Sequence, residues 1–180
     1  MVYILLAPGF EEAEALVPAD LLRRAGRSVS LVALEGEFVT GSNRIVVKAD
    51  VPLSQVDLTQ AEMVVLPGGR RGVEQLSRHP GVAGLIQEAA DREIYVAAIC
   101  AAPTLLGALG HLKGRKAVCY PGMEDGLTGA IPCPDKQVVT DGKWITGQAA
   151  GASFAFGLKL VETLAGPEKA EEVRNAVHYR

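Results

Sequence analysis

Apolar positions along the chain predict short strands that alternate with helices. Residues 2–6 form a continuous apolar run that ends at Pro8-Gly9, as expected of a strand buried on both faces. A helix is predicted from about residue 11 to residue 25, because Gly26 follows as a helix stop. Further apolar strands are predicted at residues 28–34, 63–66, 94–99 and 117–119. Further helices are predicted at residues 72–76 and 82–91, from about residue 103, and at residues 153–164 and 168–175.

Two short hairpins interrupt this alternation. Residues 38–39 and 45–47 flank one turn, and residues 138–140 and 144–146 bracket Asp141-Gly142. Strands that alternate with helices imply crossover connections, and therefore an α/β fold with a mostly parallel sheet and helices on both faces. Ligands of such sheets bind beyond the carboxyl ends of the strands. That rule directs attention to three strand ends, at Pro8-Gly9-Phe10, Pro67-Gly68-Gly69 and Cys100-Ala101-Ala102.

Composition narrows the class of protein. The 180 residues are 48% hydrophobic and 22% charged, which fits one folded domain over residues 1–180. With a net charge of -3 and 5% aromatic residues, no nucleic-acid-binding surface is expected. The longest apolar run, residues 94–102, is far shorter than the roughly 20 residues that span a membrane. Three cysteines and no basic amino-terminal signal segment favour a reducing, cytoplasmic location.

Cys100 is the residue with the clearest chemical potential. It follows an apolar strand and precedes small residues and Pro103, a residue suited to the first turn of a helix. A cysteine at such a strand-to-helix corner resembles the nucleophile of a sharp elbow, and a helix dipole there would lower the pKa of the thiol. A buried structural cysteine is the alternative interpretation. If the turn Pro67-Gly68-Gly69 neighbours Cys100, Gly69 would offer a backbone N–H to the same anion site, although a plain tight turn is the simpler interpretation of these glycines taken alone.

Glu14 is the second candidate, because its helical neighbours are apolar. At spacings of three and four it shares a face with Pro18, Leu21 and Ala25. A carboxyl on an apolar stripe needs a partner or keeps its proton. The helix dipole is enough to account for Glu11 and Glu12 in the first turn.

Other kinds of site receive little support from the sequence. None of the histidines falls at one of the three strand ends, so no Cys–His dyad is predicted, and each is expected to be solvated or to cap a helix. Cys119 and Cys133 lack a C-x-x-C pattern and a nearby histidine, which argues against a metal site. No glycine pattern matches a nucleotide-binding motif, so no cofactor is expected.

Several blocks in order resemble the ThiJ/PfpI superfamily, in the branch named after the Parkinson-disease protein DJ-one, a protein deglycase. The resemblance covers nearly the whole chain. The blocks that carry it are Glu11-Glu12-Ala13-Glu14 with Pro18, Arg23-Arg24-Ala25-Gly26, Val64-Val65-Leu66-Pro67-Gly68-Gly69, and Ala97-Ala98-Ile99-Cys100-Ala101-Ala102-Pro103-Thr104.

The resemblance implies a flavodoxin-like α/β sandwich, related to class I glutamine amidotransferase domains, that forms a homodimer. It implies that Cys100 is the nucleophile and that a protonated Glu14 donates a hydrogen bond to the sulfur. Backbone N–H groups of Gly69 and of Cys100 or Ala101 would form the anion site, and Gly68 and Arg44 would line the pocket. The implied activities are glyoxalase conversion of methylglyoxal or glyoxal to hydroxy acids and repair of early glycation adducts, with chaperone-like and oxidative-stress roles also attributed to this branch.

The chain departs from the pattern of this family at three places. Relatives often carry histidine after the short strand that follows the elbow helix, where this chain has Tyr120, a poor general base at neutral pH. Peptidase-like relatives place histidine directly after the cysteine, where this chain has Ala101. The glycine-proline-glycine stretch before the penultimate helix reads Gln148-Ala149-Ala150-Gly151.

Three functions are compatible with these residues. The first is a cysteine-dependent enzyme that acts on small reactive carbonyls, with Glu14 as proton shuttle. The second is a non-enzymatic redox sensor or chaperone-like stress protein in which Cys100 is oxidised to the sulfinate. The third is a PfpI-like hydrolase, which Ala101 disfavours.

Overall fold

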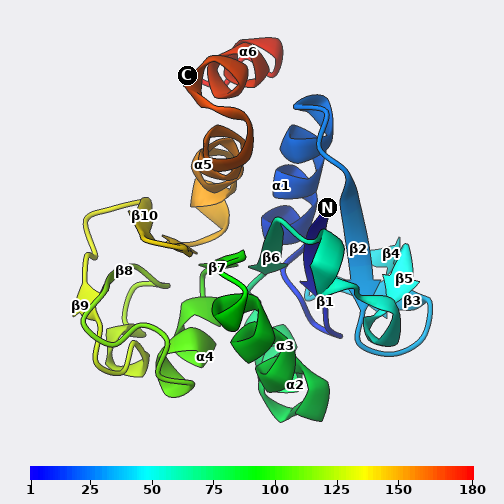
Figure 1. The fold of residues 1–180 in the computed structure, drawn as a ribbon, viewed down its shortest axis with the longest axis vertical. Coiled ribbons are helices and arrows are strands. Elements are labelled where there is room, and N and C mark those ends of the chain that lie inside the picture. Colours follow the sequence, from blue (N-terminus) through cyan, green and yellow to red (C-terminus); the bar gives the residue numbers. More distant parts are fainter.

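The computed structural model describes residues 1–180 and places a seven-stranded sheet between two layers of helices (Figure 1). The strand order is β10-β11-β7-β6-β1-β2-β5. All neighbours are parallel except the β10–β11 hairpin. These strands span Val2–Leu6 (β1), Val29–Ala33 (β2), Val51–Pro52 (β5), Met63–Leu66 (β6), Tyr95–Ile99 (β7), Val138–Asp141 (β10) and Trp144–Gly147 (β11). The predicted α/β architecture is therefore confirmed.

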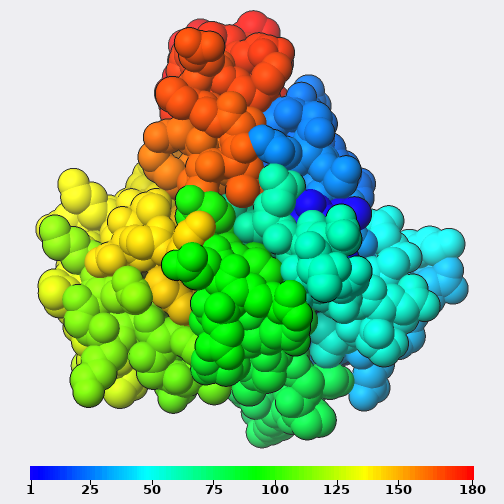
Figure 2. Space-filling view, in the orientation of Figure 1, coloured from blue at the N-terminus to red at the C-terminus, as the bar shows by residue number.

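The helices form two groups (Figure 1). One group packs as α1 with α5 and α5 with α6, and the other as α2 with α3 and α4. Their bounds are Glu12–Arg24 (α1), Arg70–Arg78 (α2), Pro80–Asp91 (α3), Ala102–Ala108 (α4), Ser153–Ala165 (α5) and Pro167–Ala176 (α6). In Figure 2 the orange-to-red helices α5 and α6 project beside the blue α1. No helix is both long enough and apolar enough to cross a membrane.

Alternate residues of the central strands supply two separate cores. Tyr3 and Leu5 of β1 face the core shared with α2, α3 and α4, whereas Ile4 and Leu6 face the core shared with α1 and α5. This alternation is why the strand reads as a continuous apolar run in the sequence, because both of its faces are covered.

Short elements lie around the main sheet. β3 (Phe38–Thr40) and β4 (Val46–Lys48) form the predicted antiparallel hairpin. The 3-10 turns are Leu53–Gln55, Leu58–Gln60, Glu124–Gly126 and Ala150–Ala152. The strand predicted at residues 117–119 is wrong in extent and in partner: β8 covers only Lys116–Ala117 and pairs with β9 (Ile131–Pro132), outside the main sheet. The reason is that the Val118 N–H donates to the Thr146 hydroxyl (3.0 Å) and not to a strand.

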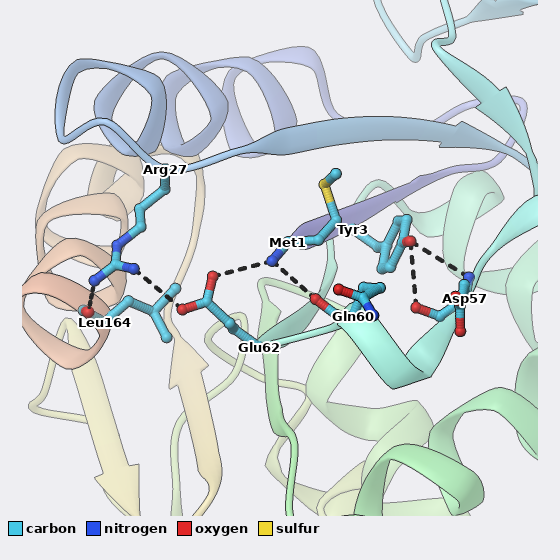
Figure 3. Close-up of polar contacts among 7 residues, drawn as sticks. All are labelled: Met1, Tyr3, Arg27, Asp57, Gln60, Glu62 and Leu164. Carbon is cyan, nitrogen blue, oxygen red and sulfur yellow. Dashed lines mark hydrogen bonds and ion pairs between the residues drawn. The ribbon is translucent and has the colours of Figure 1, made fainter.

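A network of hydrogen bonds and ion pairs lies at the end of the sheet where β1 begins (Figure 3). The Met1 amino group donates to the Gln60 carbonyl and the Glu62 carboxylate, both at 3.0 Å. Arg27 pairs with the other oxygen of Glu62 (3.1 Å) and also donates to the Leu164 carbonyl at the end of α5. This network connects β1 and the residue before β6 to the end of α5.

The three strand ends singled out in the sequence meet at one edge. β7, β6 and β1 are consecutive neighbours in the sheet and run parallel, so Cys100, Pro67-Gly68-Gly69 and Pro8-Gly9-Phe10 follow them side by side. Backbone hydrogen bonds join two of these turns, because the Glu11 N–H donates to the Gly68 carbonyl (3.0 Å) and the Gly72 N–H to the Gly9 carbonyl (3.2 Å).

Candidate active site

Cys100 occupies a strained turn between β7 and α4. Its φ of 66° lies in the left-handed region, which costs a residue with a side chain about 1–2 kcal/mol. The backbone is held there from both sides: the Cys100 N–H donates to the Gly147 carbonyl (3.0 Å), and the Tyr120 N–H donates to the Cys100 carbonyl (2.8 Å). The turn therefore has the geometry of the predicted elbow and leaves the thiol half-buried.

Glu14 is fully buried beside this thiol. Its side chain comes from the first turns of α1 and has no exposed surface. One carboxyl oxygen, Oε2, accepts a hydrogen bond from the Gly68 N–H (2.8 Å), and the other, Oε1, has no hydrogen-bond partner. Burial raises the pKa of Glu14 to about 7, although hydrogen bonds with Cys100 and Gly68 act in the opposite direction.

Gly68 and Gly69 allow the two groups to approach. A Cβ atom at Gly68 would lie 2.6 Å from the Cβ of Cys100 and 2.6 Å from Oε2 of Glu14. A Cβ atom at Gly69, whose φ is +85°, would collide with the Gly9 carbonyl oxygen. Only glycine fits at these positions, because the turn passes between Cys100, Glu14 and the end of β1.

The pKa of Cys100 corrects one prediction. The strand-to-helix corner predicts a lowered thiol pKa, but burial and the neighbouring Glu14 carboxylate raise the pKa of Cys100 to about 12. Hydrogen bonds from the Gly69 and Ala101 N–H groups lower it by less. The helix that follows, α4, is only seven residues long, which leaves little dipole to oppose the burial.

Cys100 and Glu14 therefore behave as one titrating unit. Each is buried next to the other, so two negative charges at this position are strongly disfavoured and the pair retains one proton well above neutral pH. Where that proton lies decides whether the sulfur is a thiol or a thiolate.

Other predicted site residues lie at varying distances from this pair. The Tyr120 N–H donates to the Cys100 carbonyl, but Tyr120 itself is 49% exposed. Arg44 lines a separate cavity with Arg70 and Arg71, and Cys100 is not among the residues that bound it.

The histidines are all engaged elsewhere or exposed. His79 caps α3 by accepting from the Gly81 N–H (3.2 Å), and His111 stacks on Trp144 with ring centroids 4.8 Å apart. His178 is exposed near the carboxyl end. No group of three or more His, Cys, Asp or Glu side chains is arranged to hold a metal ion.

Glu12 has a role that the sequence does not reveal. It is 4% exposed and its carboxylate accepts from the Asn43 N–H (2.8 Å) and the Asn43 side chain (2.9 Å). Burial raises the pKa of Glu12, but the hydrogen bonds from Asn43 and from the Ile45 N–H more than offset this, so its pKa lies below the usual range. The helix dipole is therefore only part of the explanation for Glu12, because the Glu12 carboxylate also fixes the loop that carries Arg44.

Comparison with known proteins identifies the family of this chain. The model of the DJ-1/PfpI family matches residues 1–163. This chain belongs to the DJ-1/PfpI family. It is 40% identical to the Drosophila melanogaster protein named dj-1beta over 172 residues, which cover 94% of this chain and 92% of that protein. It is 30% identical to the protein named Deglycase PH1704 from Pyrococcus horikoshii, over 91% of this chain and 98% of the relative.

Solved structures of DJ-1 proteins share the fold. The crystal structure of Drosophila melanogaster DJ-1beta superposes with a TM-score of 0.93 at 37% identity, over 99% of this chain and 97% of that one. An oxidised Toxoplasma gondii DJ-1 superposes with a TM-score of 0.94 at 31% identity, over 99% of this chain and 97% of that one. The flavodoxin-like sandwich implied by the sequence resemblance is thus confirmed.

Proposed function

We propose that this protein is a cysteine-dependent glyoxalase or deglycase that converts methylglyoxal, glyoxal or early glycation adducts to hydroxy acids. The observation that carries the proposal is the buried carboxyl of Glu14, which touches the thiol and has a pKa of about 7. A proton-transfer group works best when its pKa lies near the working pH. Membership of a family that includes a protein named deglycase supports the same conclusion.

The chemistry begins when the Glu14 carboxylate, which forms near pH 7, takes the proton of the Cys100 thiol and leaves the negative charge on the sulfur. In that state the sulfur accepts hydrogen bonds from the carboxyl of Glu14 and from the Gly69 and Ala101 N–H groups, which all favour the thiolate. The sulfur attacks the aldehyde carbon of methylglyoxal, and the new alkoxide takes the proton from Glu14 to give a hemithioacetal and the Glu14 carboxylate. The neighbouring N–H groups stabilise the developing oxyanion.

The second half of the reaction moves one proton between adjacent carbons. The carboxylate of Glu14 removes the proton from the hemithioacetal carbon, giving an enediolate, and returns it to the neighbouring carbon, while the hydroxyl proton of the first carbon moves to the oxygen of the second. The first carbon is thereby oxidised to a thioester while the second is reduced to an alcohol, so no external oxidant is needed. Water then hydrolyses the thioester, releasing lactate and restoring the sulfur.

The enzyme is favoured over a purely redox-sensing protein by the same carboxyl. Oxidation of Cys100 to a sulfinate requires only a thiolate with access to peroxide. A protonated Glu14 would donate a hydrogen bond to the thiolate or sulfinate in that case too, but only the proton shuttle requires a carboxyl whose proton is exchangeable near neutral pH. The homodimer and the chaperone-like role stay predictions for this chain.

The proposal is tested by following lactate formation from methylglyoxal. Cys100→Ser removes the nucleophile and Glu14→Gln removes the exchangeable proton, so each is expected to lower kcat/KM at least about a hundredfold. Cys133→Ser is the matched control, because Cys133 is a free, half-buried cysteine outside the site and should leave the rate unchanged.

Two outcomes would contradict the proposed enzymatic function. One is lactate formation by both site variants at the wild-type rate. The other is an inactive wild-type protein in which mild peroxide adds two oxygens to Cys100 alone, which would favour the redox sensor.

A further inference from the structure

A positively charged cavity of about 590 Å³ lies next to the cysteine site. It is bounded by the turn after β1, the loop after β3 and the first turn of α2, and none of its lining residues is hydrophobic. Arg70, one of its residues, directly follows Gly69, whose N–H faces the sulfur. The residues around it are Pro8, Gly9, Thr40, Gly41, Ser42, Arg44, Arg70, Arg71 and Gln75.

The arginines of this cavity form no ion pair within the chain. The chain has eleven arginines, and seven of them form ion pairs. Of the other four, Arg180 is the last residue, and Arg44, Arg70 and Arg71 all line this one cavity. No carboxylate lines it. Unpaired arginines normally spread over a surface to limit their mutual repulsion, so three around one cavity leave a positive charge that the protein itself does not balance.

The walls of the cavity are held in place by the backbone. The Gly9 N–H donates to the Thr40 carbonyl and the Ser42 N–H donates to the Phe10 carbonyl, both at 2.8 Å. A Cβ atom at Gly9, whose φ is +87°, would lie 2.7 Å from the Cβ of Arg71. The segment that carries Arg44 and the helix that carries Arg71 are thus both in close contact with the turn after β1, so the backbone around the cavity is held in place.

Glu12 fixes the loop that carries Arg44. The Glu12 carboxylate accepts from the Asn43 N–H, and Arg44 itself has a φ of 67°. The Ser42 hydroxyl lies between Glu11 (2.8 Å) and Glu12 (3.2 Å) and shares its one proton with them. This hydroxyl is therefore occupied, and the three guanidinium groups are the charged donors of the cavity, beside the Thr40 hydroxyl and the Gln75 amide.

From these observations we infer that the arginine cavity binds a phosphate monoester. Three guanidinium groups balance the roughly two negative charges of such a group at neutral pH, and each offers a planar pair of N–H donors to phosphate oxygens. The absence of any hydrophobic lining residue favours a compact, fully hydrated anion over a large organic ligand. The inference concerns binding alone and does not depend on turnover at Cys100.

The phosphate has two possible sources, a separate small phosphoester or a phosphate carried by a carbonyl compound that reacts at Cys100. Glycerol 3-phosphate represents the first and glyceraldehyde 3-phosphate the second. If the phosphate belongs to a substrate of Cys100, the aldehyde binds more tightly than the alcohol to the wild-type protein, and Cys100→Ser abolishes that difference. If it is separate, the two esters bind equally to both proteins.

The test is isothermal titration calorimetry with inorganic phosphate and then with glycerol 3-phosphate. The double variant Arg70→Gln/Arg71→Gln is expected to weaken the binding of both ligands at least about tenfold. Its matched control is Arg24→Gln/Arg92→Gln, which removes the same amount of charge from two exposed arginines that pair with Asp20 and Glu88. The control is expected to bind as the wild type does, and because all four side chains are exposed both variants should fold.

Binding to the Cys100→Ser protein separates this inference from the proposed enzyme, since inorganic phosphate should bind there with unchanged affinity. The inference is overturned if inorganic phosphate shows no saturable binding. It is equally overturned if the control variant loses as much affinity as the Arg70/Arg71 variant, because the effect would then be one of net charge.

Discussion

Glu14 is a carboxyl removed from water without a cation to compensate it. Its Oε2 atom accepts a hydrogen bond from the Gly68 N–H, its only polar side-chain neighbour is the Cys100 thiol, and Oε1 has no partner. Its ionisation therefore opposes folding. In the unfolded chain it ionises near pH 4.5, whereas in the folded protein it keeps its proton up to about pH 7. Between these values the folded state binds more protons than the unfolded state, so stability falls as the pH rises.

A pH-dependent difference in stability is therefore predicted for Glu14→Gln. The amide keeps an acceptor for Gly68 and cannot ionise. Between pH 5 and pH 8 the wild type should lose about 2–3 kcal/mol more unfolding free energy than the variant, because one proton bound by the folded state alone changes stability by about 1.4 kcal/mol for each pH step of one. Urea unfolding at the two pH values measures this difference. Glu74→Gln, at an exposed glutamate of α2, should follow the wild type. Parallel pH profiles for wild type and Glu14→Gln would show that Glu14 is ionised in the folded protein.

The sequence predicts some residues of the site better than others, for a physical reason. Cys100 is recognisable because strand, cysteine, small residues and Pro103 form one local pattern, and Glu14 because helical spacing places it on an apolar stripe. Glu12 is not recognisable, since its partners at residues 42–45 are some thirty positions away and its first-turn location already has a local explanation. The predicted lowering of the Cys100 pKa is wrong because burial comes from the whole fold and not from the adjacent helix.

Helices α1 and α5 set the position of Glu14, because they pack against each other over the core. Gly157 of α5 makes this packing possible. A Cβ atom there would lie 2.7 Å from Leu21 Cδ1 and 3.1 Å from the Cα of Pro18, one turn after Glu14. Pro18 is also the residue that leaves the Glu14 carbonyl without a helical N–H donor.

A pair of glycine substitutions tests this packing. Alanine is a better helix former than glycine by about 1 kcal/mol, so Gly84→Ala in α3, with nothing within 4 Å of the added carbon, should stabilise the protein by up to that amount. Gly157→Ala gains the same propensity but overpacks the α1–α5 contact, and should destabilise by about 1–2 kcal/mol in net terms. Thermal unfolding midpoints compare the two. Equal increases for both substitutions would show that α1 and α5 are not in close contact at Gly157.

At the element level the sequence predicts long apolar strands and amphipathic helices well. Residues 63–66 are predicted with the observed bounds, and the helices ending near residues 91 and 164 differ from α3 and α5 by a few residues. The strand at residues 117–119 fails because a side-chain hydrogen bond from Thr146, a residue remote in sequence, captures the Val118 N–H. Two-residue strands such as β5 and β9 carry too few positions for any period to be visible.

At the scale of the whole molecule, strand order brings the chemistry together. Parallel neighbours β7, β6 and β1 end at one edge, so the elbow, the glycine turn and the turn after β1 meet there although the chain separates them by up to ninety residues. The alternation of strands and helices predicts that such an edge exists, but not which strands are neighbours. The arginine cavity depends on that order, since it combines the ends of β1 and β3 with the start of α2.

Cys100 and Glu14 share one proton above pH 7, and the Glu14 carboxylate accepts it from the thiol when the sulfur reacts. The most direct test of this claim is the rate of Cys100 alkylation by iodoacetamide as a function of pH, in the wild type and in Glu14→Gln. We expect the wild-type rate to rise with a midpoint near pH 7 and then to level off, because the Glu14 carboxylate that forms there accepts the thiol proton as the sulfur reacts. This midpoint should vanish in Glu14→Gln. A wild-type rate that stays low through pH 9 and climbs only toward pH 12 would show that the Glu14 carboxylate raises the thiol pKa without accepting its proton.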